Sequence, residues 1–155
     1  MLVVSYVQGE KAQYSRAMSP IFPPPYLVVF MMTLESIADE FSLDLIVLFG
    51  SRATGVARAD SDTDIAVRGV RILSPDEFLT VARRLDSLYQ NVDLVDLRRA
   101  SPLLLGAIGA DAKVLFQRHS HLFEEFRTFA WNQFLDFKPY FDISRARNKS
   151  EIEGL

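Results

Sequence analysis

The sequence of 155 residues contains no cysteine. This absence excludes disulfide bonds, thiolate metal sites and cysteine nucleophiles, and it is compatible with a reducing compartment, so we expect a cytoplasmic protein. The apolar runs are short as well, and none approaches the roughly 20 residues that a membrane-spanning helix needs. The first residues lack the basic segment and the long apolar run of a secretory signal. No membrane association is therefore expected.

An excess of charge of one sign is also missing. Lysine and arginine number 17, aspartate and glutamate number 20, and the formal net charge is −3. Proteins that bind long stretches of nucleic acid usually gather lysine and arginine on one surface, and no long basic run occurs here. Direct binding to nucleic acid, and hence polymerisation on a template, is therefore disfavoured. The length and the hydrophobic fraction of 49% fit one folded domain.

The most informative segment begins where an apolar run ends. Residues 43–49 predict a buried strand, Gly50 ends it, and Ser51 stands where a short helix over residues 51–56 would begin. The first turn of a helix leaves backbone N–H groups unpaired at the positive end of the helix dipole, which favours a phosphate. Taken alone, this pattern more often marks a tight turn with a helix cap.

Two carboxylates follow at a spacing that indicates a metal-binding site beside this segment. Ten residues separate Ser51 from Asp62, and residues 62–67 predict a second strand on which Asp62 and Asp64 share one face. Two carboxylates in one partly buried place repel each other, so one would be protonated unless a cation neutralised both. Mg²⁺ is the expected cation, because it prefers oxygen ligands and commonly joins carboxylates to nucleotide phosphates.

A third carboxylate is available on a later apolar run. Residues 92–97 predict a strand that contains both Asp93 and Asp96, which lie three positions apart and therefore on opposite faces. Only one of them can join Asp62 and Asp64, and the spacing alone does not decide which.

This order of strand, Gly-Ser, helix, Asp-x-Asp strand and later Asp resembles the nucleotidyltransferase superfamily that includes DNA polymerase beta and kanamycin nucleotidyltransferase. The short chain is further similar to the minimal nucleotidyltransferase (MNT) antitoxins, which are paired with HEPN-domain toxins. The resemblance covers residues 34–140 and includes the segment Leu-Asp-Phe-Lys-Pro-Tyr at 135–140. It implies a polymerase beta-like nucleotidyltransferase fold of the α/β (α+β) class, with a mixed sheet flanked by helices in a single domain.

The resemblance also implies roles for the motif residues. Gly50 and Ser51 would hold the nucleotide phosphates, while Asp62 and Asp64 would bind the catalytic Mg²⁺. For Arg52, a phosphate contact and a structural salt bridge remain equally good hypotheses.

The third carboxylate that the resemblance implies is Asp93, as a metal ligand or as a general base, because it is the first Asp of its strand. The implied activity is transfer of AMP from ATP, with one or two Mg²⁺ ions, to a tyrosine of a cognate HEPN ribonuclease toxin. Two alternatives stay open. The chain could be an antitoxin that acts by binding alone with a vestigial nucleotide site, or a small-molecule nucleotidyltransferase of the aminoglycoside type.

The whole chain is expected to divide into three parts. We expect a proline-rich extension over residues 1–32, a nucleotidyltransferase core over 33–117, and an aromatic helical segment with a tail over 118–155. The extension is either an arm that packs on a partner or a segment upstream of the true translation start. Further helices are expected at 33–41, 75–89, 102–108 and 121–137, and a further strand at 112–116.

The C-terminal segment is rich in aromatic residues. On a helix, Phe129 and Trp131 point away from the stripe that would pack on the sheet. That stripe consists of Phe123, Phe126, Phe134 and Phe137. Large apolar side chains outside the core favour a protein interface, and we expect its partner to be a HEPN-domain toxin or a second copy of the chain.

Overall fold

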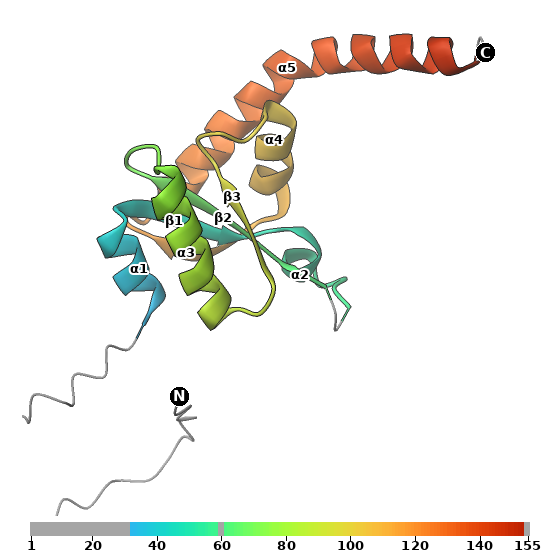
Figure 1. The fold of residues 1–155 in the computed structure, drawn as a ribbon. Coiled ribbons are helices and arrows are strands. Elements are labelled where there is room, and N and C mark those ends of the chain that lie inside the picture. The colour runs from blue at the N-terminus through green and yellow to red at the C-terminus, as the bar shows by residue number, and fades with distance from the viewer. Residues whose placement is uncertain (1–31, 59–60, 154–155) are drawn as a thin grey trace, which may run out of the picture. The chain divides into compact units, whose positions relative to one another are not determined.

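In the computed structural model of this chain, residues 32–58 and 61–153 are described. Helices and strands alternate along them (Figure 1). Every predicted strand and helix is present, and most ends differ from the prediction by one to three residues. In chain order the elements are α1 (Leu34–Glu40), β1 (Leu43–Leu48), α2 (Gly50–Thr54), β2 (Thr63–Gly69), α3 (Pro75–Leu88), β3 (Val92–Asp96), α4 (Pro102–Asp111), β4 (Lys113–Gln117) and α5 (Leu122–Glu153).

The strands form one mixed sheet in the order β3-β2-β1-β4. β1 is antiparallel to both of its neighbours, β2 and β4, whereas β2 and β3 are parallel. A parallel pair needs a crossover connection, and α3 supplies it between the end of β2 and the start of β3. The predicted α/β fold with a mixed sheet flanked by helices is therefore confirmed.

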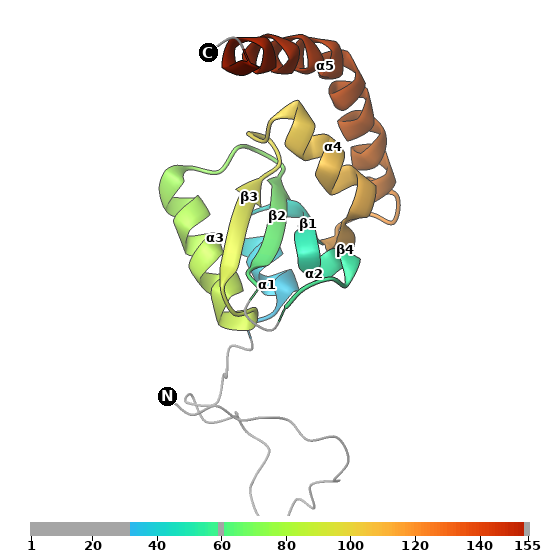
Figure 2. The same cartoon turned by 90° about the vertical axis from the view of Figure 1, so that its right-hand side faces the viewer.

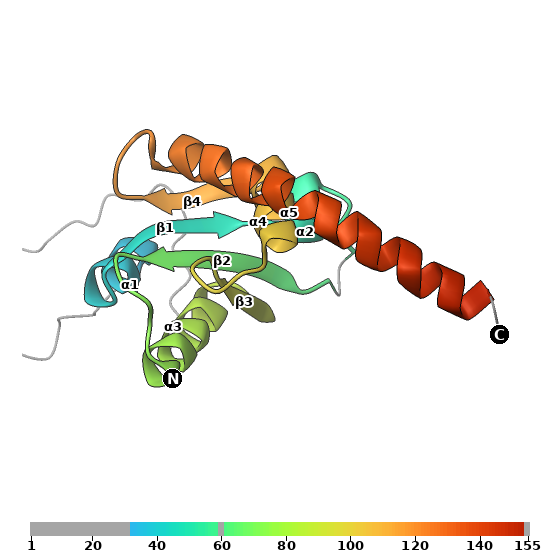
Figure 3. The same ribbon diagram turned by 90° about the horizontal axis from the view of Figure 1, so that it is seen from above.

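Alternate strand residues face two separate apolar cores. Ile46 and Ile65 face a core that α1 and α3 close. Val47 and Ala66 face a second core, which α4 and α5 close. Figure 3 shows α3 and α5 on opposite sides of the sheet. Because helices cover both faces, the ends of the strands are where functional side chains can reach a ligand.

The helix starts follow from local sequence. Ser74 caps α3, since its hydroxyl accepts a hydrogen bond from the Glu77 N–H while the Glu77 carboxylate accepts one from the Ser74 N–H at 2.9 Å. Pro75 then occupies the first turn, where its missing N–H costs nothing. Ser101 caps α4 in the same way through the N–H of Leu104.

The predicted end of the last helix is wrong. The prediction stopped at residue 137, yet α5 continues to Glu153 with Pro139 inside it. An internal proline leaves the carbonyl four residues earlier, here that of Leu135, without its usual partner and bends the helix. Leu135 is exposed, so water can bind that carbonyl, and Figure 2 shows that α5 bends.

A proline-rich extension was predicted for residues 1–32. All of these residues except Met32 lie outside the described part of the chain. Among the helices of residues 32–58 and 61–153, none has the length and apolar character needed to cross a membrane.

Candidate functional site

The predicted motif residues gather at one end of the sheet. β1 runs into α2, and because β1 and β2 are antiparallel, the end of β1 lies beside the start of β2, with Leu48 opposite Ile65. β2 and β3 are parallel, so the start of β3 lies there too. The Gly-Ser turn and the carboxylates are therefore brought together from three elements.

Gly50 sits directly against Asp64. Its φ of +67° is in the left-handed region, which favours glycine. A Cβ atom at this position would overlap the Oδ2 atom of Asp64 and lie only 2.9 Å from its Cγ. The N–H of Phe49 donates a hydrogen bond to the Asp64 carbonyl at 2.9 Å. The turn and the Asp-x-Asp strand are thus held as one unit.

The start of α2 has free hydrogen-bonding capacity. Its N-cap residue is Phe49, which has no side chain able to cap the first N–H groups. Within the described part of the chain, the Ser51 hydroxyl makes no hydrogen bond, whereas the Ser51 carbonyl accepts bonds from Val56 and Thr54. The hydroxyl and the first N–H groups are available to an anionic group.

Asp64 and Asp93 stand side by side. They are direct partners in the parallel register of β2 and β3. Side chains two residues apart on a strand point to the same face. Asp64 and Asp93 each lie two residues before a side chain that packs on the α4 and α5 side of the sheet, Ala66 on β2 and Val95 on β3. Neighbouring strands lie roughly 4.8 Å apart, so two side chains on one face at the same register position are close.

Asp96 lies on the other face of β3, as the spacing of the two carboxylates predicts. Its side chain is 6% exposed, its Oδ1 accepts the N–H of Arg98 at 2.9 Å, and its Oδ2 is 3.7 Å from Nε of Arg99. These contacts hold the turn after β3 and leave Asp96 remote from Asp64.

Asp62 differs from its predicted place on the strand. β2 begins at Thr63, so Asp62 lies in the preceding loop with its side chain exposed. The physical reason is that the Asp62 carbonyl accepts a hydrogen bond from Arg52, 3.1 Å away, instead of joining the ladder. Among the described residues, no three acidic, histidine or cysteine side chains form a ready-made metal cluster. Asp62 would therefore have to turn toward Asp64 to share an ion.

The electrostatics of the site centre on Asp64. Burial raises the pKa of the Asp64 carboxyl above its usual value of 3.8, and the negative charges of Asp93 and then Asp62 raise it further. The ionised form is therefore disfavoured in the folded protein unless a cation compensates.

This shift predicts a pH-dependent stability. A raised folded-state pKa means that Asp64 favours the folded state when protonated, below about pH 3.8, and that this contribution is lost as the pH rises through the raised pKa. We expect the metal-free Asp64→Asn variant to be more stable than the unmodified chain at pH 7, with the difference shrinking toward pH 4. Urea unfolding of both proteins across this range measures the difference. A constant difference would contradict the assignment, since other acidic groups act equally in both.

Arg52 has a structural role that the sequence did not specify. Its Nε and Nη2 atoms donate to the carbonyl of Ser61, and Nε also donates to that of Asp62. The guanidinium thus fixes the backbone just before Asp64. The N–H groups that do so are no longer free to donate to a phosphate. Neither a carboxylate partner nor a phosphate contact is required to explain its position.

Thr63 is a residue that sequence reasoning missed. Its hydroxyl donates to the carbonyl of Gln90 at 2.8 Å, and its N–H donates to that of Asn91 at 2.8 Å. These bonds tie the start of β2 to the start of β3 and so align Asp64 with Asp93. A hollow of about 350 Å³ beside them is lined by Leu48, Arg52, Thr63, Tyr89 and Gln90. Only the position of Thr63 between the two aspartates could have drawn attention to it.

Comparisons with known proteins place this site in a family context. Residues 33–121, which contain all the candidate site residues, match the family model described as polymerase beta, nucleotidyltransferase. The protein adenylyltransferase MntA of Shewanella oneidensis is 40% identical over 84 residues, which cover 52% of this chain and 60% of MntA. The matched segment thus spans less than two thirds of that relative.

Two solved structures agree with this match. One is a toxin–antitoxin with AMP-PNP, which is 28% identical with a TM-score of 0.61 and covers 77% of this chain and 95% of its own. The other is tri-AMPylated Shewanella oneidensis HEPN toxin in complex with MNT antitoxin, which is 26% identical with a TM-score of 0.56, over 77% of this chain and 92% of the matched chain.

Proposed function

The chain belongs to the polymerase beta nucleotidyltransferase family, and we propose that it is an antitoxin that transfers AMP from ATP to a tyrosine of a HEPN-domain toxin. The observation that carries the proposal is the contact of Gly50 with Asp64 beside Asp93. The names of the relatives support a HEPN toxin as the acceptor of AMP: one is a protein adenylyltransferase, and another is bound to an AMPylated HEPN toxin.

Mg²⁺ is part of the proposal. The donor set suits it, because Asp64 and Asp93 offer oxygen ligands at the same register position. Burial, and then the negative charge of Asp93, raise the pKa of Asp64, a shift that a bound cation would oppose. Asp64 and Asp93 would hold the ion, with Asp62 joining them from its loop. Bound there, Mg²⁺ would neutralise charge on the triphosphate and on the leaving pyrophosphate.

The residues of the chain bind and orient the reactants. The N–H groups at the start of α2 and the Ser51 hydroxyl donate to the phosphates, which Gly50 allows to come close to the backbone. The tyrosine oxygen of the acceptor attacks the α-phosphorus, the bond from this phosphorus to the bridging oxygen breaks, and pyrophosphate leaves. Asp93 either accepts the proton of the tyrosine hydroxyl or serves as the third metal ligand. Catalysis then comes mainly from in-line positioning.

An antitoxin that acts by binding alone would need none of these features. Two adjacent carboxylates on β2 and β3 repel each other and lower stability, and such costs are usually kept for function. The small-molecule alternative is less well supported, because the relatives described above are named for a protein adenylyltransferase and for toxin–antitoxin complexes.

The proposal is tested with labelled ATP. The purified chain, Mg²⁺ and the HEPN-domain protein of the same genome are incubated with ATP labelled at either the α- or the γ-phosphate. We expect the HEPN protein to gain label from α-labelled ATP alone, on a tyrosine identified by mass spectrometry. Formation of a complex without label would favour neutralisation by binding alone. Label on a free aminoglycoside in the absence of any protein acceptor would favour the small-molecule alternative.

A further inference from the structure

A second concave site lies at the far end of the sheet. A pocket of about 500 Å³ opens between the end of β2, the turn after β3, α4 and α5. Its floor is apolar and includes the buried residues Leu97 and Phe126. Arg68, which lines it, lies four residues after Asp64 on β2, or about 13 Å along the strand. The pocket is therefore separate from the candidate nucleotide site.

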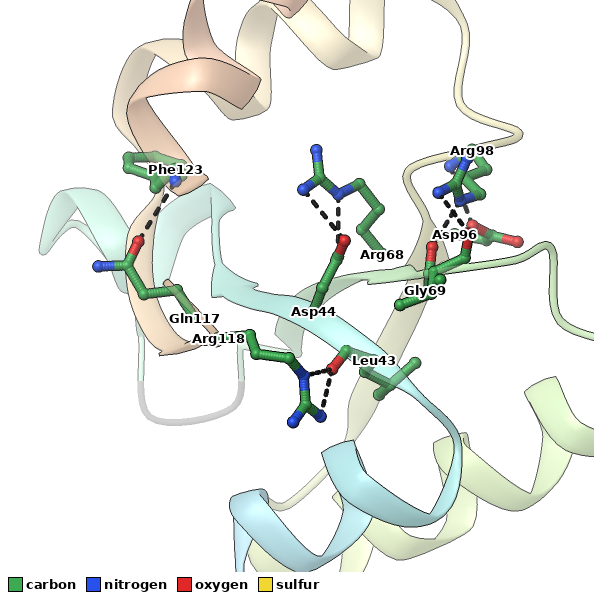
Figure 4. A network of polar contacts seen from close by, with 10 residues as sticks. Leu43, Asp44, Arg68, Gly69, Asp96, Arg98, Gln117, Arg118 and Phe123 are labelled. Atoms are coloured by element: carbon green, nitrogen blue, oxygen red, sulfur yellow. Dashed lines mark hydrogen bonds and ion pairs between the residues drawn. The ribbon is translucent and has the colours of Figure 1, made fainter. Parts of the chain in front are cut away.

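The mouth of this pocket carries positive charge. Arg68 makes a bidentate ion pair with Asp44, at 2.9 and 3.1 Å, so its charge is compensated. Arg98 instead donates to the carbonyl of Gly69 at 2.6 Å (Figure 4). It also donates to the carbonyl of Val70 at 2.9 Å. Among the described residues, no carboxylate pairs with the Arg98 guanidinium. A carboxylate from outside would find a fixed guanidinium beside an apolar floor.

An apolar row on α5 continues from the pocket. Phe129 and Gln133 line the pocket. At 100° per residue, Phe137 before the bend at Pro139 and Tyr140 after it fall within about a quarter of a turn of them. Among the α5 residues whose burial is described, the last fully buried side chain is Ala130. Phe129, just before Ala130, is 53% exposed, and Tyr140 is 69% exposed. Phe137, which was expected in the stripe that packs on the sheet, is instead 38% exposed, so that part of the prediction is wrong.

These parts form one elongated surface, which we name the α5 groove and define by Ile72, Arg98, Phe129, Gln133, Phe137 and Tyr140. Its side chains are spaced at i, i+4, i+8 and i+11 along α5, the pattern into which the apolar stripe of another helix packs. Ile72, 54% exposed, flanks the pocket on the core side. Exposed aromatic side chains around a buried floor are typical of binding hot spots.

We propose that the α5 groove docks an amphipathic helix of the HEPN-domain toxin, with an acidic residue of that helix facing Arg98. This inference rests on the proposed function. The unpaired charge of Arg98 selects an acidic partner, and the pocket lies on the α4 and α5 face of the sheet, the same face as Asp64 and Asp93. A toxin held here stays on the face where its tyrosine must react, so docking and chemistry use separate surfaces of one face.

The test compares two faces of α5. The full chain carrying Phe129→Ser with Tyr140→Ser is compared with the matched control Leu135→Ser, which removes a side chain that is 47% exposed on another side of the same helix. The probe is the HEPN-domain protein of the same genome, and its affinity is measured by calorimetry. We expect the groove variant to bind at least about 30-fold more weakly and the control to remain within about 3-fold. AMP transfer by the groove variant should show a raised KM for the toxin and an unchanged kcat.

Other results distinguish a failure of the docking inference from a failure of the proposed function. If the unmodified chain binds and labels the toxin and the groove variant does so equally well, the docking inference is wrong while the proposed function stands. If the groove variant loses self-association, measured by light scattering, and keeps toxin affinity, the groove is covered by a second copy of the chain and the inference is again wrong. If the unmodified chain neither binds nor labels the HEPN protein, the proposed function itself fails. Arg98→Gln is an independent check, expected to weaken binding and to reduce its dependence on salt concentration.

Discussion

Replacement of Asp64 or Asp93 by Asn is expected to lower AMP transfer by at least about 10³-fold. Asn keeps the size of the side chain and removes the negative charge, so the pair on β2 and β3 would no longer attract a divalent cation. The measurement is the initial rate of AMP incorporation into the HEPN-domain protein at saturating ATP and Mg²⁺. Complex formation with the toxin should be retained, because the docking surface proposed above lies elsewhere.

The control is Asp96→Asn. It makes the same chemical change on the same strand as Asp93, but on the other face, where Asp96 holds the turn through the N–H of Arg98. The Asn side-chain oxygen can still accept that bond, so we expect activity within about 5-fold of the unmodified rate and some loss of stability. A large loss with Asp96→Asn and none with Asp93→Asn would reverse the assignment of the third carboxylate.

The choice between these two aspartates shows how far sequence reasoning reaches. The period of a strand was enough to place Asp93 and Asp96 on opposite faces. It could not say which face carries Asp64, because that depends on the register between β2 and β3. The register is set by long-range contacts, among them the bond from the Thr63 hydroxyl to the Gln90 carbonyl. Local pattern therefore gave the candidates, and tertiary structure brings one of them beside Asp64.

The partner of Arg52 and the end of α5 could not be predicted from the sequence for a similar reason. The sequence offered Arg52 a phosphate or a carboxylate, yet in the structure it binds the carbonyls of Ser61 and Asp62, groups that every residue carries and that no sequence pattern marks. For α5, the prediction ended the helix at residue 137, whereas the helix continues through Pro139 to Glu153. Leu135, whose carbonyl loses its usual partner, is 47% exposed, so water can replace the missing N–H.

A tension between stability and function runs through the site. Asp64 is partly desolvated and placed next to another carboxylate, which raises its pKa and disfavours the charged form. The same arrangement would become favourable once a cation and a triphosphate arrive. Asp64→Asn should thus abolish activity while stabilising the metal-free chain, a combination that a purely structural role for Asp64 does not produce.

Gly50→Ala is expected to reduce AMP transfer at least about 100-fold and to destabilise the fold by about 2–4 kcal/mol. The added Cβ would overlap the Asp64 carboxylate, and the φ of +67° is unfavourable for alanine. Either the turn or Asp64 has to move, and each movement separates the phosphate-binding backbone from the metal-binding carboxylate. The initial rate of AMP incorporation and urea unfolding measure the two effects.

Gly55→Ala separates these two causes. Gly55 ends α2 with a φ of +82°, so alanine is strained there as well, but a Cβ at Gly55 would meet no atom within 4 Å. We expect this variant to lose about 1 kcal/mol and to keep activity within about 3-fold. Equal losses of activity in both variants would mean that backbone strain in α2 is sufficient to explain the effect. A loss confined to Gly50→Ala would instead show that the turn must lie against Asp64 for the transfer to occur.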